Sequence, residues 1–194
     1  MDTVPQVFSV FNPSGSHFGH ATLSPAGWIG CMTGVNSQGV YLDLHDGTSM
    51  GGAQIFVDRS SLLNSFTDAL AELDSVEGLG HRVMSIRSDV SCLTQICDPT
   101  KAMCFENPVF ASVLLPHDET ILAVTNTFFN PAFGIQVKDT LSKSVERKNN
   151  LWARLKEFKV KSNIDTIMEI MELGLYKEDG SPGPVLQNPT YPNN

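Results

Sequence analysis

Short runs of apolar residues separated by turn-forming residues dominate the first forty-odd positions of the chain, and this pattern predicts β-strands. Four runs carry the pattern: 7–11, 17–23, 27–35 and 39–44. Turn sequences lie at 12–15, which reads Asn-Pro-Ser-Gly, and at 36–38, which reads Asn-Ser-Gln. The chain is therefore expected to begin with two antiparallel hairpins. The glycine-rich polar segment 46–52 is expected to be a loop.

A helical period replaces the strand pattern after this loop. Apolar residues at helical spacing share one face from Leu62 to Leu73, and Ser60 or Ser61 is expected to cap the helix. Strands are then predicted at 91–97 and 102–106, joined by a turn in which Pro99 presets the backbone and Asp98 caps it.

Another short strand is predicted at 121–125, and the C-terminal third is predicted to be helical. One helix is expected over 139–158, and a second begins near 162–163 and ends near Gly174. The residues 179–194 are expected to form an irregular tail. The order of strands, helix, strands and helices favours a single α+β domain with antiparallel sheets over 1–194, rather than a βαβ alternation.

Charge and composition exclude several classes of protein. The 194 residues include 13 Lys and Arg and 21 Asp and Glu, which gives a net charge of −8 without a basic block. Binding to nucleic acid is therefore disfavoured. No apolar run reaches the length of a membrane span, so no membrane span is expected. The compartment stays open between the cytoplasm and, after removal of an upstream leader, a secreted or periplasmic location.

The cysteines and histidines give no clear metal or redox site. The four cysteines are Cys31, Cys92, Cys97 and Cys104; none forms a CxxC pair, and core thiols are the favoured interpretation. Nucleophilic chemistry at Cys31 is a weaker alternative, because nothing nearby in sequence would lower its pKa. His17 and His20 fall in a predicted strand, where side chains three apart point to opposite faces. Neither a metal nor an organic cofactor is implied.

Two polar residues are candidates for chemistry. Asn126 follows a predicted strand, where its amide could donate to a developing oxyanion or cap a turn. Arg147 lies on an amphipathic helix, where a solvated charge is the ordinary interpretation. Taken alone, these patterns indicate only an α+β domain.

Five segments in this order resemble the linear-amide branch of the N-terminal-nucleophile (Ntn) hydrolases, which includes choloylglycine hydrolases, penicillin V acylases and isopenicillin-N acyltransferase-like enzymes. Each segment resembles a motif of the family, and together they cover roughly residues 27 to 175. The segments are 30–40 (GCMTGVNSQGV), 42–47 (LDLHDG), 91–106, 124–126 (VTN) and 144–147 (SVER).

The resemblance implies an αββα sandwich of antiparallel sheets, incomplete at both ends of this chain. It also implies hydrolysis or acyl transfer at a linear, non-peptide C–N amide bond by an N-terminal cysteine whose own amine is the base. Asn126 falls on the family's substrate and oxyanion position, and Arg147 on its active-site arginine. The family's second oxyanion asparagine is replaced by His45 or Asp46. A small-molecule amide is the implied substrate.

The sequence departs from the family at the nucleophile, because no cysteine lies at or near the N-terminus of the 194 residues. An amidase or acyltransferase whose nucleophilic cysteine lies outside this chain is therefore the first hypothesis. A catalytically inactive homologue that acts as a binding module is the alternative. A second chain or copy that completes the sheet is expected as a partner, because open sheet edges are a liability.

Overall fold

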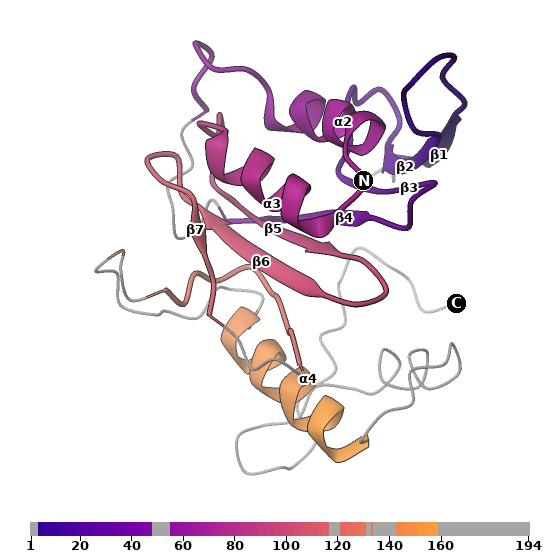
Figure 1. Ribbon diagram of the computed structural model, residues 1–194. Coiled ribbons are helices and arrows are strands. Elements are labelled where there is room, and N and C mark those ends of the chain that lie inside the picture. The colour runs from indigo at the N-terminus through magenta and orange to yellow at the C-terminus, as the bar shows by residue number, and fades with distance from the viewer. Residues whose placement is uncertain (1–3, 48–54, 117–120, 131–132, 134–142, 159–194) are drawn as a thin grey trace.

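A computed structural model describes residues 4–47, 55–116, 121–130, 133 and 143–158 of the chain. Seven antiparallel strands form one sheet in this part, and each strand neighbours the next in chain order (Figure 1). The strands are β1 (Gln6–Phe11), β2 (His20–Pro25), β3 (Thr33–Asn36), β4 (Tyr41–Asp46), β5 (Cys92–Cys97), β6 (Ala102–Asn107) and β7 (Val113–Leu114). The expectation of an α+β fold built on an antiparallel sheet is confirmed.

The hairpins of the N-terminal part are confirmed, with changes at the ends of their strands. The second strand begins at His20 rather than at residue 17. The run 27–35 is extended only from Thr33, because Gly27 and Gly30 adopt positive φ angles of 86° and 102° and turn the chain before β3. Strand β4 continues through Asp46, which the sequence assigned to the following loop.

Helix α2 (Leu62–Glu72) lies across one face of the sheet (Figure 1). Ser61 precedes the helix, but its side chain makes no capping hydrogen bond. The Asp89 carboxylate accepts the bond from the Leu62 N–H instead, at 3.1 Å, so the expected serine cap is wrong. At the far end, Asn36 Nδ2 donates to the carbonyl oxygens of Leu70 and Leu73, which ties the second hairpin to the last turn of the helix.

Helix α3 (Val76–Ser85) lies beside α2 on the same face and was not predicted from the sequence. Ser75 caps it by accepting a hydrogen bond from the Gly78 N–H. Gly78 and Gly80 lower the helix propensity of this segment. Packing nevertheless favours glycine at position 80, because a Cβ atom there would lie only 3.1 Å from the Phe105 ring.

The core on this face is formed by both helices and the central strands. Its fully buried members include Leu42 of β4, Phe66 and Leu70 of α2, Leu79 of α3 and Phe105 of β6. Burial of such side chains contributes roughly 1.5–3 kcal/mol each to the free energy of unfolding.

The opposite face carries a smaller apolar cluster and helix α4 (Ser144–Phe158) (Figure 1). Leu93 and Cys104 alternate with the residues of the first core along β5 and β6, and Phe128 packs on them. The predicted strand 121–125 is wrong: Ile121 makes a single bridge, and the chain then crosses this face without a strand ladder. Side-chain hydrogen bonds, rather than a strand ladder, fix this crossing segment (121–130) against the sheet.

Several expectations for the C-terminal third lie outside the described residues. These are the start of the helix at 139–142, the helix after 162–163 and the tail 179–194. In the part of the chain that is described, no helix is long and apolar enough to cross a membrane.

Candidate active site

A line of hydrogen bonds joins three segments that lie far apart in the sequence. Asn126 Nδ2 donates to the backbone oxygen of Asp46 at 3.0 Å, across 80 positions. Arg147 Nη2 donates to Asn126 Oδ1, also at 3.0 Å. The end of β4, the crossing segment 121–130 and the start of α4 therefore meet at Asn126.

Two threonines fix the crossing segment to the start of α4. Thr125 Oγ1 donates to the Ser144 carbonyl oxygen at 2.9 Å. The hydroxyl groups of Thr127 and Ser144 also form a hydrogen bond, and both residues are fully buried. These contacts place Asn126 beside the first turn of the helix that carries Arg147.

Glu106 binds the backbone of the crossing segment three and four residues after Asn126. Its carboxylate accepts hydrogen bonds from the Phe129 N–H and from the Asn130 N–H, the latter at 2.9 Å. Glu106 is 0% exposed. Desolvation by burial raises the pKa of this carboxyl, and it outweighs the opposing effects of the two N–H groups and of Lys148.

Lys148 of α4 interacts electrostatically with Glu106. Its amine lies 3.4 Å from the centre of the Phe129 ring, and its charge faces Glu106. Burial lowers the pKa of the Lys148 amine, although the carboxylate of Glu106 opposes that effect. One sequence signal indicates that Glu106 is special: it is the only charged residue between Ala102 and Asn107.

Gly47 provides the space for the crossing segment to approach β4. A Cβ atom at Gly47 would lie 2.8 Å from Phe128 Cε1 and 3.1 Å from the Cα atom of Cys92. A side chain therefore does not fit here, and the close approach brings Asn126 within reach of the Asp46 carbonyl.

Of the four predicted site residues, the structure brings together Asp46, Asn126 and Arg147. Asp46 takes part through its backbone oxygen. His45 lies next to this group on β4 but contacts Asp43 instead: its Nε2 atom is 3.3 Å from Asp43 Oδ2, without the angle of a hydrogen bond. Asp43 also accepts a 2.6 Å hydrogen bond from the Thr33 hydroxyl.

The thiols are unsuited to nucleophilic attack. Burial, with a smaller effect from Asp43, raises the pKa of Cys31 to about 12. Burial also raises the pKa of Cys92 to about 11 and that of Cys104 to about 12. Cys97 is half-buried, and its pKa is raised as well. The interpretation of these cysteines as core thiols is confirmed for Cys31, Cys92 and Cys104.

The described residues hold no group of three or more His, Cys, Asp or Glu side chains that could bind a metal ion. His20 stacks on Phe11 of the neighbouring strand, with 4.7 Å between the ring centres. His17 precedes β2, so the two histidines do not share a strand.

The arrangement around Asn126 is suited to stabilising negative charge. A guanidinium group only donates hydrogen bonds, so the contact with Arg147 fixes Oδ1 as the acceptor and turns Nδ2 toward β4. The amide nitrogen carries a second N–H group besides the one given to Asp46. A preoriented amide of this kind can donate to an oxygen atom on which charge develops.

Comparison with known proteins supports a relation at the level of fold. No protein-family model matches the sequence, and no curated protein matches it. Among solved structures, an N-acylethanolamine-hydrolyzing acid amidase orthologue from Caenorhabditis elegans matches with a TM-score of 0.59 and 13% identity, over 94% of this chain and 76% of the amidase.

Two bacterial hydrolases match similarly. The conjugated bile acid hydrolase of Clostridium perfringens, in a variant form, gives a TM-score of 0.55 at 12% identity, over 88% of this chain and 71% of its own. Penicillin V acylase of Agrobacterium tumefaciens gives 0.59 at 12% identity, over 87% of this chain and 62% of the acylase.

These neighbours are Ntn hydrolases of the choloylglycine hydrolase type. The chain described above has their fold, that of amide hydrolases. The resemblance inferred from the sequence is thus confirmed at the level of fold.

Proposed function

We propose that the chain carries the oxyanion-binding part of an amidase or acyltransferase that acts on a linear, non-peptide C–N amide bond of a small molecule. The observation that carries this proposal is the line of hydrogen bonds from the Asp46 backbone through Asn126 to Arg147. The fold shared with known amide hydrolases supports the reaction class.

In the proposed reaction, a thiolate attacks the amide carbonyl carbon and the carbonyl oxygen gains negative charge. The Asn126 N–H donates to that oxygen, and Arg147 keeps the amide oriented. The C–N bond then breaks, the amine leaves with a proton, and the acyl group passes from the thioester to water or to an acceptor.

The remaining two site residues take supporting roles in this proposal. Asp46 positions Asn126 through its carbonyl oxygen. His45, which lies next to this group on β4, is a second donor toward the oxyanion in this proposal. As part of the proposal, a single domain over residues 1–194 provides these groups.

The nucleophile of the proposed reaction is a cysteine outside these 194 residues. The raised thiol pKa values support this assignment, because a thiol with a pKa near 12 is almost fully protonated at neutral pH. The same observation favours the second candidate function, a homologue of the same fold that binds amides without cleaving them.

The experiment that separates the two candidates starts from the protein in its native source. Intact mass and N-terminal sequencing identify any longer chain or partner peptide that begins with cysteine. The purified protein is then incubated with a panel of N-acyl amides, and amine release is measured before and after alkylation with iodoacetamide. Amine release that alkylation abolishes supports the amidase; amide binding without release supports the binding module.

A further inference from the structure

Among the residues that the structure describes, no strand pairs with the outer edge of β1, and its apolar side chains are exposed on both faces. Phe8 is 68% exposed and Val10 61% exposed on one face, and Val7 and Phe11 are more than 40% exposed on the other. The strand contains no charged residue. It therefore lacks the protective features, such as an edge lysine or a bulge, by which sheet edges avoid pairing.

The hydrogen-bonding pattern shows which backbone groups point outward from this edge. The Ala26 N–H donates to the Pro5 carbonyl oxygen at 2.8 Å, which marks the pair 5 and 26 as hydrogen-bonded. The β1–β2 register continues from this pair, and in an antiparallel ladder hydrogen-bonded pairs alternate with pairs that are not. Ser9 therefore bonds inward to β2, whereas Phe8 and Val10 point their N–H and C=O groups outward.

Apolar residues lie at matching positions on both sides of Ser9 in β1, with a Val on one side where the other side has a Phe. The run from Val7 to Phe11 reads Val-Phe-Ser-Val-Phe. If a second copy of β1 pairs antiparallel with Ser9 on a two-fold axis, every Phe lies opposite a Val, and Ser9 lies opposite itself. Pairs of an aromatic with a β-branched residue are among the favourable cross-strand pairs, and two serine hydroxyls can hydrogen-bond.

In this register the outward-pointing backbone groups of the two β1 strands also lie opposite one another. Phe8 of one copy faces Val10 of the other, and both residues have outward-pointing N–H and C=O groups. The ladder can therefore form without disturbing the bonds between β1 and β2.

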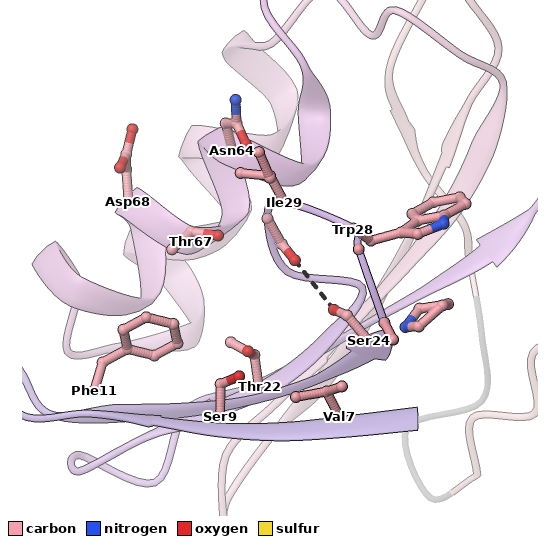
Figure 2. A pocket seen from close by; sticks show the side chains of 14 residues that line it. Val7, Ser9, Phe11, Thr22, Ser24, Trp28, Ile29, Asn64, Thr67 and Asp68 are labelled. Atoms are coloured by element: carbon pink, nitrogen blue, oxygen red, sulfur yellow. Dashed lines mark hydrogen bonds between the residues drawn. The ribbon is translucent and has the colours of Figure 1, made fainter. Parts of the chain in front are cut away.

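A groove beside β1 adds apolar surface next to the proposed axis. It has a volume of about 620 Å³ and lies between β1, β2 and α2, because α2 does not extend over the edge strand. Figure 2 shows Val7, Ser9 and Phe11 projecting from β1 into this space, with Trp28 at its end. In a two-fold pair, the grooves of the two copies lie next to each other on one face of a continuous sheet.

We propose that the chain forms a two-fold symmetric dimer in which the β1 strands of two copies pair antiparallel about Ser9. The opposite edge of the described sheet does not offer the same surface, because β7 spans only Val113 and Leu114.

The first test is the mass of the protein in solution. Sedimentation velocity of the full chain over a wide concentration range is expected to show a monomer–dimer equilibrium. The double variant Phe8→Lys/Val10→Lys places lysines opposite one another across the axis, and it is expected to raise the dissociation constant at least about tenfold.

The matched control changes two exposed apolar residues on the same face of the sheet but away from the edge. Leu23→Lys/Val35→Lys substitutes residues of β2 and β3 that are 42% and 41% exposed. Edge pairing predicts that this control still forms the dimer. Loss of the dimer in both double variants indicates face-to-face packing and overturns the proposal, as does a wild-type chain that stays monomeric.

Cysteine cross-linking tests the register. Residues opposite each other in a pair that is not hydrogen-bonded have Cα atoms about 4.5 Å apart, within the range of a disulfide. Ser9→Cys is therefore expected to form a covalent dimer under mild oxidation. Val10→Cys is not, because residue 10 lies opposite residue 8 of the other copy. Cross-linking of Val10→Cys but not of Ser9→Cys overturns the proposed axis.

Discussion

Arg147 Nη2 lies 3.0 Å from Asn126 Oδ1, and this contact determines which way the Asn126 amide faces. The guanidinium group has no acceptor, so the amide oxygen must face it and the amide nitrogen must face the Asp46 carbonyl. A residue on α4 thus orients a donor on a separate segment. The orientation is what makes Asn126 useful in the proposed reaction, and it is open to direct tests.

Replacement of Asn126 by Ala removes the proposed oxyanion donor. In the proposed amidase, Asn126→Ala is expected to lower kcat about 10²- to 10³-fold, the usual effect of losing one such donor. The midpoint of thermal unfolding is expected to fall by several degrees, because the substitution also removes the hydrogen bonds of Asn126 with Asp46 and Arg147. Amide hydrolysis kinetics and a thermal melt are the two measurements.

Asn149→Ala is the control for this substitution, because Asn149 is an exposed asparagine on α4. It is expected to leave both kcat and the melting temperature unchanged. Equal kinetics for the wild type and Asn126→Ala would remove Asn126 from the proposed site.

The pairing of Arg147 with Asn126 can be measured without an activity assay. A double-mutant cycle on this chain uses Arg147→Ala, Asn126→Ala and both together, with the free energy of unfolding determined by urea denaturation. A hydrogen bond with a charged donor predicts a coupling energy of about 1.5–3 kcal/mol, less where water reaches the pair. Additive single effects would mean that Arg147 does not orient the amide.

Gly47 is expected to tolerate no side chain. Gly47→Ala forces a methyl group against the Phe128 ring and the Cys92 backbone, which is expected to lower the free energy of unfolding by about 1–3 kcal/mol. The same substitution is also expected to reduce the proposed amidase activity, because a shift of Phe128 moves Asn126. Urea denaturation measures the first effect.

Gly19→Ala is the matched control for the effect on stability. The nearest atom to a Cβ at Gly19 is the Phe11 carbonyl oxygen at 3.6 Å, which is ordinary van der Waals contact. A change in stability as large for Gly19→Ala as for Gly47→Ala would show that loss of glycine flexibility, rather than the clash with Phe128, is responsible.

Glu106 is expected to make stability depend on pH. Its pKa in the folded protein is raised, so folding favours its protonated form. Its contribution to the free energy of unfolding is therefore complete below the pKa of an unfolded glutamate, about 4.3, and is lost as the pH rises through the raised value. The slope for one proton is at most about 1.4 kcal/mol per pH unit.

Glu106→Gln is expected to remove this slope, as measured by urea denaturation at a series of pH values. Glu77→Gln is the control with the opposite sign, because the hydrogen bond with Lys101 lowers the pKa of the exposed Glu77 carboxyl. An unchanged pH profile in Glu106→Gln would contradict the raised pKa.

Local sequence determined the elements whose apolar pattern and turn chemistry agree. The turn between β5 and β6 is one case, since the Asp98 carboxylate accepts hydrogen bonds from the N–H groups of Thr100 and Lys101. Strand β1 is another. The order of the five family-like motifs along the chain also predicted the fold, and it indicated Asn126 and Arg147 as candidate site residues.

The tertiary structure decided what lies between segments far apart in the chain. Helix α3 carries Gly78 and Gly80, which disfavour a helix locally, and packing against Phe105 makes Gly80 acceptable there. The predicted strand at 121–125 is wrong: only Ile121 makes a bridge, and the Thr125 hydroxyl donates to the Ser144 carbonyl oxygen at the start of α4.

The same limit applies to the candidate site. No sequence pattern shows that Glu106 accepts hydrogen bonds from the N–H groups of Phe129 and Asn130. Nor does any pattern show that Asp46 binds Asn126 through its backbone carbonyl oxygen rather than its carboxylate. Local patterns report the preferences of neighbouring residues. The orientation of Asn126 depends on three segments that meet only after the sheet has formed, so only the folded chain fixes it.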